Sequence, residues 1–178
     1  SPSRGLGDVY KRQVFSLRQV TGGIEFRSTM SSREAAALLH SYLRLDDDLE
    51  DIYQHLIKDS RTAAVILSYR GMRIIQQEPW ECLVSFICSI HSNIPRITRT
   101  VEAIAQTYGE PINFEGVTWY TFPTPSRLAQ VSELNLRRLG LGFRAPYVAR
   151  TAYMVAHGNP LLEAIQELPY AQAKDCLL

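Results

Sequence analysis

The chain has 178 residues, of which 46% are hydrophobic and 21% are charged, and its formal net charge is only +1. This length and apolar content suffice for one buried core, whereas the nearly neutral charge excludes a protein that binds nucleic acid through a uniformly basic surface. No apolar stretch is long enough to cross a membrane, so we expect a soluble protein without membrane contact.

The first predicted elements are a hairpin and a capped helix. Residues 14–19 and 23–28 alternate apolar and polar side chains around a glycine turn at 21–23, which predicts two antiparallel strands. Ser31 and Glu34 have the spacing of a capping box, so a helix should begin there and reach about residue 43. Further helices are predicted over 46–57, 61–69, 79–90, 94–108, 126–129, 132–139, 146–157 and 161 to the end, with an irregular surface loop over 109–125.

The helix predicted over 79–90 is the most apolar element. Proline at its first position loses no hydrogen bond that a helix start would use. Apolar side chains recur at the helical spacing of i, i+3, i+4, i+7 and i+8, and two more extend the stripe nearly all round the axis. We therefore expect a buried central helix. Its apolar residues are Trp80, Leu83, Val84, Phe86, Ile87, Cys88 and Ile90.

A polar elbow formed by His91, Ser92 and Asn93 separates this helix from the next one. Short polar side chains of this kind cap helices. Arg96 and Arg99 then fall in the first turns of the following helix, where the helix dipole is positive and basic residues are least favourable. Their position indicates an anionic or hydrogen-bonding partner.

A glycine-rich turn is the second unusual segment. Gly140 and Gly142 permit backbone angles that other residues avoid, and Pro146 marks the start of a helix. Phe143 and Arg144 lie between them. An exposed aromatic ring beside an arginine on a stiff turn can wedge a duplex open and bind the base that loses its partner. A phenylalanine in such a turn is more often part of the hydrophobic core, so the motif alone does not distinguish a DNA wedge from a core residue.

The cysteines give no sign of a disulfide framework or a metal site. Cys82, Cys88 and Cys176 show no paired spacing, which favours reduced thiols and a reducing compartment. Cys88 and His91 stand three residues apart, but no third ligand lies near them in the sequence. We therefore expect no metal and no cofactor.

Five segments, taken in order along the chain, resemble one known family. From residue 14 to residue 178 the chain is similar to the 8-oxoguanine DNA glycosylases/AP lyases of the helix-hairpin-helix superfamily. Several ordered segments are far more specific than any single motif. They are VFSLRQ (14–19), YLRLDDDLEDIYQHL (42–56), QEPWECLVSFICSIHSNIPRI (77–97), GVTWYTFPTPSRLA (116–129) and LRRLGLGFRAPYV (136–148).

The resemblance implies a mostly α fold, in which a small truncated α/β piece precedes an array of glycosylase helices. Residues 14–45 would be the remnant of an N-terminal α/β domain like TATA-binding protein. Residues 46–178 would be the helical glycosylase domain, truncated before the helix-hairpin-helix. Residues 1–13, SPSRGLGDVYKRQ, are unlike the family at this point, so we interpret them as a non-native leader outside the fold.

The resemblance also implies DNA-binding roles for three side chains. In the family, two arginines bind the cytosine left unpaired when the damaged guanine flips out, and an aromatic wedge stacks beside that cytosine. Arg96 and Arg144 match the two arginines, and Phe143 matches the wedge.

The elbow departs from the family at two of its three positions. His91 stands where the family usually has the first Asn of an Asn-rich elbow, the residue that fills the vacated space. Ser92 also departs from the pattern, whereas Asn93 keeps it. We expect all three to contact DNA, and the change at His91 to affect how strictly cytosine is required opposite the lesion.

The family's catalytic residues have no match here. Its nucleophilic lysine and its aspartate lie in or just after a hairpin that reads roughly LPGVGTK, which the 178 residues do not contain. A Schiff-base lyase needs a reactive amine in a pocket, and neither Lys58 nor Lys174 matches the nucleophile. We therefore expect both catalytic residues beyond Leu178, and no base excision by this chain itself.

The implied function is base-excision DNA repair. The intact parent would be an 8-oxoguanine DNA N-glycosylase with AP-lyase activity, acting as a monomer on double-stranded DNA with 8-oxoguanine opposite cytosine. It would work in the nucleus of a eukaryote, or in the cytoplasm and nucleoid of a prokaryote. Three alternatives are a glycosylase with altered opposite-base preference, a non-catalytic DNA-binding module, and a helical interaction protein without a nucleic-acid role.

Overall fold

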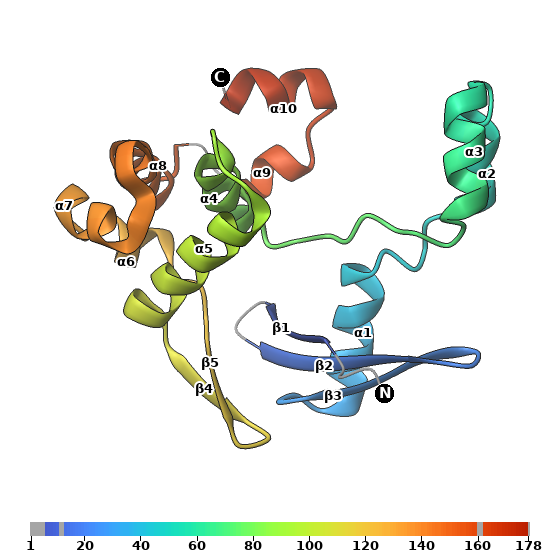
Figure 1. The fold of residues 1–178 in the computed structure, drawn as a ribbon, viewed down its shortest axis with the longest axis horizontal. Helices are drawn as coiled ribbons and strands as arrows, with labels where there is room; N and C mark the ends of the chain where they lie inside the picture. The colour runs from blue at the N-terminus through green and yellow to red at the C-terminus, as the bar shows by residue number, and fades with distance from the viewer. Residues whose placement is uncertain (1–5, 11–12, 160–161, 178) are drawn as a thin grey trace. The chain divides into compact units, whose positions relative to one another are not determined.

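The computed structural model describes residues 6–10, 13–159 and 162–177 (Figure 1). The chain divides into two compact units, one made of residues 1–29 and 78–178 and the other of residues 30–77. The division into 14–45 and 46–178 rests on the family resemblance and stays a prediction.

The first unit begins with a three-stranded antiparallel sheet in the order β1-β2-β3. The predicted hairpin is confirmed, because β2 and β3 pair along their length across a tight turn at Thr21 and Gly22. Glycine suits this turn because the φ of Gly22 is +84°. The strands are β1 (Leu6–Tyr10), β2 (Gln13–Val20) and β3 (Gly23–Ser28).

Strand β1 lies inside the segment that we excluded from the fold. It pairs in register with β2, from Leu6 opposite Leu17 to Tyr10 opposite Gln13. Residues 6–10 therefore take part in the sheet, whereas the interpretation of residues 1–13 as a non-native leader stays a prediction. The sequence LGDVY gives little local signal because glycine and aspartate are depleted in strands, so pairing with β2 rather than propensity defines the strand.

The rest of the first unit is an array of helices, among which α4 to α8 begin within one residue of the predicted positions. A wide turn over Arg137–Leu141 and a short 3₁₀ turn over Gly142–Arg144 connect α7 to α8. The helices are α4 (Pro79–Ser89), α5 (Ile94–Tyr108), α6 (Pro125–Leu128), α7 (Glu133–Leu136), α8 (Ala145–Ala156), α9 (Leu162–Gln166) and α10 (Tyr170–Leu177).

The segment predicted as one helix from residue 161 to the end is two helices instead. Helix α9 ends at Gln166 and α10 begins at Tyr170. Pro169 stands directly before α10. Proline lacks a backbone N–H and disfavours the helical conformation of the preceding residue, which explains the break.

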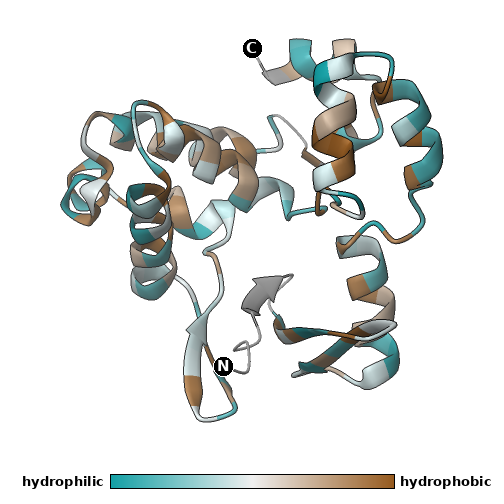
Figure 2. Ribbon diagram, turned by 45° about the vertical axis from the view of Figure 1, so that its right-hand side comes forward, coloured by the Kyte–Doolittle hydropathy of each residue, from teal (hydrophilic) through white to brown (hydrophobic). Residues whose placement is uncertain are grey.

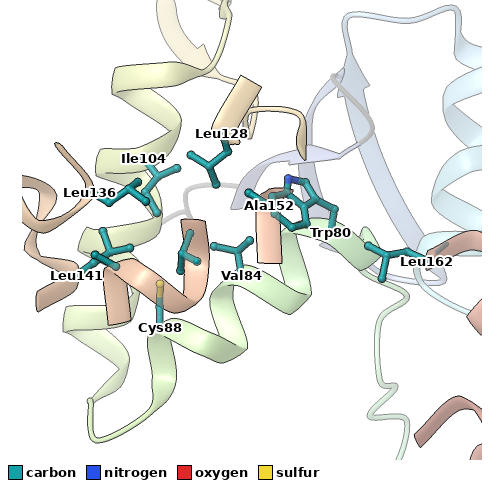
Figure 3. Close-up of a cluster of buried hydrophobic side chains, with 11 residues drawn as sticks. Trp80, Val84, Cys88, Ile104, Leu128, Leu136, Leu141, Ala152 and Leu162 are labelled. Atoms are coloured by element: carbon teal, nitrogen blue, oxygen red, sulfur yellow. The ribbon is translucent and has the colours of Figure 1, made fainter. Parts of the chain in front are cut away.

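Side chains from α4 to α9 form the hydrophobic core of this unit, and Figure 3 shows them pointing toward one another. Trp80 is its largest member. Its indole Nε1 donates to the carbonyl oxygen of Pro123 at 2.9 Å, and its ring meets that of Phe122 edge to face at 6.4 Å. The buried members are Trp80, Val84, Cys88, Ile104, Leu128, Leu136, Leu141, Ala145, Val148, Ala152 and Leu162.

Helix α4 is buried on one face rather than nearly all round. Trp80, Val84 and Cys88, spaced by four residues, turn toward the core. Phe86 and Ile90, however, are 72% and 42% exposed. The prediction of full burial was wrong because the apolar count of a helix does not say how many of its faces are covered.

The connection over 109–125, which we predicted to be irregular, contains a hairpin of β4 (Pro111–Phe114) and β5 (Val117–Tyr120). Its turn residues, Glu115 and Gly116, have φ of +51° and +77°, as a type I′ turn requires. Pro111 is the first residue of β4, a position that tolerates proline although it has no backbone N–H to donate to the neighbouring strand. The prediction of an irregular loop was therefore wrong.

The second unit consists of helices whose starts are capped by side chains. The predicted cap is confirmed at Ser31, because its Oγ accepts from the backbone N–H of Glu34, while the Glu34 carboxylate accepts from the Ser31 hydroxyl at 2.5 Å. Asp48 and Asp59 cap the next two helices in the same way. The helices are α1 (Ser32–Tyr42), α2 (Leu49–Leu56) and α3 (Ser60–Ser68).

Apolar and polar residues alternate along the helices in Figure 2. Among the described residues, no helix is both long enough and apolar enough to span a membrane.

Candidate nucleic-acid interface

The elbow between α4 and α5 is held by its own backbone and by one cap. His91 adopts the left-handed region with a φ of +48°, which is uncommon outside glycine. Asn93 then caps α5, because its Oδ1 accepts from the backbone N–H of Arg96 at 3.0 Å. The predicted capping by the elbow is confirmed at this residue.

The glycine-rich turn needs glycine for its backbone angles. Gly140 and Gly142 have φ of +91° and +58°. A Cβ atom at either position would meet nothing within 4 Å, so conformation rather than crowding requires glycine. Leu141 between them is fully buried and fixes the turn to the core, whereas Phe143 is half exposed.

Arg144 joins this turn to the elbow. Although it is an arginine, only 3% of it is exposed. Its Nε donates to the carbonyl oxygen of Ile90 at 2.7 Å, and its Nη2 donates to that of His91 at 2.9 Å and again to Ile90. Two turns separated by more than fifty residues are thereby fixed against each other.

The side chains at this junction form a small aromatic group. The rings of His91 and Phe143 have centroids 6.4 Å apart and planes tilted by 59°. The guanidinium carbon of Arg144 lies 4.5 Å from the centre of the Phe143 ring, within the range of a cation–π contact. The structure therefore brings together His91, Phe143 and Arg144 from the predicted set.

Arg96 and Ser92 are placed differently. Arg96 is exposed on the first turn of α5, and its guanidinium has no hydrogen-bond or ion-pair partner among the residues that the structure describes. Ser92 is half-buried, and its hydroxyl oxygen is buried without a partner. The neighbouring Arg99 donates from Nε to the carbonyl oxygen of Pro95 at 3.3 Å.

The backbone carbonyls of Ile90 and His91 are the part of this site that the sequence analysis missed. The last carbonyls of a helix have no partner within it, and basic side chains often bind them. The sequence does signal these free carbonyls at the end of α4. It does not signal that an arginine 54 residues later binds them.

Within the described part of the chain, no group of three or more His, Cys, Asp or Glu side chains could hold a metal ion. Cys88 and His91, which the sequence analysis considered and did not favour as a metal site, belong to no such group there.

The buried thiol of Cys88 yields a prediction. Burial raises its pKa from 9.0 to about 11, and the nearby Arg144 opposes this shift only in part. At pH 8, we expect a thiol-specific disulfide reagent to label the exposed Cys82 and Cys176 promptly, and Cys88 only after unfolding. Because the pKa of Cys88 is higher in the folded than in the unfolded protein, the protonated thiol contributes to the free energy of unfolding. This contribution is complete below pH 9 and is lost between pH 9 and about 11. Prompt labelling of all three thiols would contradict this burial.

Comparisons with known proteins identify similar sequences and similar solved structures. The family model described as the N-terminal domain of 8-oxoguanine DNA glycosylase matches residues 4–83, beginning inside the segment that we interpreted as a leader. The N-glycosylase/DNA lyase of Saccharomyces cerevisiae is 37% identical over 97% of this chain and 48% of its own length. The chain therefore spans about half the length of this curated relative.

Two solved structures are similar over nearly the whole chain. The structure of MBOgg1 in complex with a low-affinity DNA ligand has a TM-score of 0.89 and 29% identity, covering 97% of this chain and 59% of that one. The Clostridium acetobutylicum 8-oxoguanine glycosylase/lyase, in complex with double-stranded DNA containing cytosine opposite 8-oxoguanine, has a TM-score of 0.88 and 26% identity, covering 96% and 59%.

The mostly helical fold with its small sheets is thus that of a helix-hairpin-helix DNA glycosylase, as predicted. Within this superfamily, the chain is similar to the 8-oxoguanine DNA glycosylase family, whose N-terminal domain model matches residues 4–83.

Proposed function

We propose that the protein acts in base-excision DNA repair as an 8-oxoguanine DNA N-glycosylase with AP-lyase activity. These 178 residues supply its DNA-bending, wedge and opposite-cytosine recognition part. The observation that carries the proposal is the junction of the two turns, which presents the half-exposed Phe143 beside His91. An aromatic side chain at a rigid turn is suited to insert between base pairs and kink a duplex.

The DNA-binding residues are those of the elbow and the turn. Phe143 inserts between stacked base pairs, and His91 fills the space that the flipped base leaves. Arg96 binds the unpaired cytosine. Ser92, Asn93 and Arg144 belong to the same elbow and turn, and we propose that they also contact DNA. The proposal draws support from the Clostridium acetobutylicum relative, whose complex contains cytosine opposite 8-oxoguanine.

The partner in this proposal is double-stranded DNA with 8-oxoguanine opposite cytosine, bound by a monomer. The protein works where genomic DNA lies, which is the nucleus of a eukaryote or the cytoplasm and nucleoid of a prokaryote. No metal or cofactor is required.

The chemistry itself requires residues that have no match in this chain. The family's lysine nucleophile forms a Schiff base, and borohydride reduces that intermediate to a stable link between protein and DNA. The test is borohydride trapping on an 8-oxoguanine:cytosine duplex, with this chain and with a form continued through its reading frame. We expect trapping by the continued form only.

Each outcome of the trapping experiment has one meaning. Trapping by the 178-residue chain would show that it contains a lysine nucleophile of its own. Absence of trapping by both forms, with duplex binding by both, would replace the enzyme by a non-catalytic DNA-binding module.

His91 supports a second prediction, on opposite-base preference. An asparagine amide presents one carbonyl acceptor and two N–H donors, whereas a neutral imidazole presents one donor and one acceptor on a ring that lies near the Phe143 ring and can also stack. We expect His91→Asn to raise the preference for cytosine over adenine opposite 8-oxoguanine by about tenfold, which is about 1.4 kcal/mol. Binding to the two duplexes measures this ratio. An unchanged ratio would show that His91 does not set the opposite-base preference.

A further inference from the structure

His91 is the residue of the proposed DNA-binding set whose charge changes near neutral pH. An imidazole ordinarily gains a proton as the pH falls from 8 to 5, whereas a guanidinium stays charged and hydroxyl, amide and phenyl groups stay neutral. The asparagine that the resembled family usually has at this position does not titrate. A dependence on pH at this position would therefore be particular to this chain. The other members of the set are Ser92, Asn93, Arg96, Phe143 and Arg144.

The backbone of His91 is fixed, and its ring lies at the surface. The residue is in the left-handed region with a φ of +48°, and its carbonyl oxygen accepts from Arg144 Nη2 at 2.9 Å. The side chain is exposed, and its ring centroid lies 6.4 Å from that of the Phe143 ring. In the proposed function, a charge on this ring would lie beside the wedge, on the face that meets DNA.

The charged groups nearest His91 are cations. Three elements meet at this junction, which are α4, α5 and the turn that leads into α8. The nearest carboxylates on the two helices, those of Glu81 and Glu102, are more than two helical turns from the elbow. No group closer to the junction can therefore neutralise an imidazolium. The charged and titratable groups nearest the junction are Cys88, Arg96, Arg99, Arg144 and Tyr147.

Two other histidines have acidic partners. His40 Nδ1 lies 3.3 Å from Asp46 Oδ2, and His55 Nδ1 lies 3.7 Å from Asp51 Oδ1. His91 forms no such ion pair with any residue that the structure describes. The phosphates of a bound duplex would thus be the first anions to approach its ring.

DNA favours the cationic form of a group at its surface, because the phosphates stabilise a nearby positive charge. An imidazolium also offers two N–H donors, whereas the neutral ring offers one. By linkage, a proton taken up on binding makes the affinity rise as the pH falls. A cation that neutralises a phosphate also releases counterions, which steepens the dependence of affinity on salt concentration.

Resting on the proposed function, we propose that His91 makes DNA binding by this surface dependent on pH, because its cationic form adds a positive charge that faces the phosphates. The duplex is bound more tightly, and with a steeper salt dependence, when the ring is charged. When the ring is neutral, His91 contacts DNA only by packing, and Arg96 and Phe143 supply the remaining contacts.

The test compares the unaltered chain with His91→Asn at pH 6 and pH 8. Asparagine tolerates the left-handed region, so this variant keeps the elbow. Binding is measured by fluorescence anisotropy at several salt concentrations, on an 8-oxoguanine:cytosine duplex and on the same duplex without the lesion. We expect the gain in affinity from pH 8 to pH 6 to be about three- to tenfold larger in the unaltered chain. Its salt slope at pH 6 should be steeper by up to about one unit.

Two further variants show whether the charge at position 91 is the cause. His91→Lys stays cationic at both pH values, so it should lose the additional pH dependence and keep the steeper salt slope at pH 8. His157→Asn is the matched control, because His157 is an exposed histidine at the end of α8 whose Nδ1 lies 2.7 Å from the carbonyl oxygen of Tyr153. It should keep the pH dependence of the unaltered chain.

The outcomes separate this inference from the proposed function. Equal pH dependence in the unaltered chain and in a folded His91→Asn protein would overturn the role of His91 and leave the proposed function standing. Binding without preference for the lesion would overturn the proposed function, and the same comparison on the undamaged duplex would still decide the role of His91. Absence of binding to both duplexes at both pH values would overturn both.

Discussion

Replacing Trp80 by alanine is expected to lower the free energy of unfolding by about 3–5 kcal/mol, the usual cost of truncating a large buried aromatic side chain. Trp80 is only 5% exposed and packs in the core shown in Figure 3. The substitution creates a cavity, and it also leaves the carbonyl oxygen of Pro123 without its 2.9 Å donor. Urea denaturation followed by circular dichroism measures the change.

Phe86→Ala is the matched control, because Phe86 lies on the same helix with 72% of its surface exposed. Its truncation should change the free energy of unfolding by no more than about 1 kcal/mol. Equal losses in the two variants would contradict the distinction between the buried and exposed faces of α4.

Replacing Phe143 by alanine is expected to weaken binding to a lesion duplex by about tenfold or more. Stacking of an aromatic side chain on a base contributes about 1–3 kcal/mol by alanine substitution, and about 1.4 kcal/mol corresponds to a factor of ten. The ring is half exposed, so it is available to DNA without unfolding of the turn. Anisotropy titration with an 8-oxoguanine:cytosine duplex gives the ratio of dissociation constants.

Phe143→Tyr and Tyr147→Ala separate wedge insertion from a general loss of exposed aromatic surface. Tyrosine keeps the ring, so it should preserve affinity within about twofold. Tyr147, which is 58% exposed on α8, serves as the aromatic control. Equal weakening by Tyr147→Ala would argue against a specific wedge at Phe143.

Helix starts were the part of the fold that could be predicted most closely. Ser31, Pro79 and Pro146 each marked a start that the structure places within one residue. These signals are local, because a cap or a first-turn proline acts on backbone groups only a few residues away.

The predictions were wrong where the structure depends on pairing between separate strands or on which other elements cover a helix face. The β4–β5 hairpin was not predicted, because its Glu115-Gly116 turn is not one of the commonest hairpin signals and Pro111 is a residue type that usually interrupts strands. Strand β1 likewise depends on β2. The exposure of Phe86 could not be predicted either, since periodicity identifies an apolar face but not what covers it.

The candidate site shows the same division. The glycine turn and the Asn93 cap follow from residue types, and the structure confirms both. The clamp of Arg144 on the carbonyls of Ile90 and His91 does not, because no residue pattern specifies which carbonyls an arginine binds 53 and 54 residues away. The DNA contacts of these residues stay a prediction.

The most direct test of the central claim is the affinity of this chain for three duplexes, measured by fluorescence anisotropy at one low salt concentration. The duplexes carry 8-oxoguanine opposite cytosine, 8-oxoguanine opposite adenine, or no lesion. If the site reads the unpaired cytosine, the first duplex should bind most tightly, and Arg96→Ala should lose that preference. Equal binding to all three duplexes, unchanged by Arg96→Ala, would contradict a site that reads the unpaired cytosine.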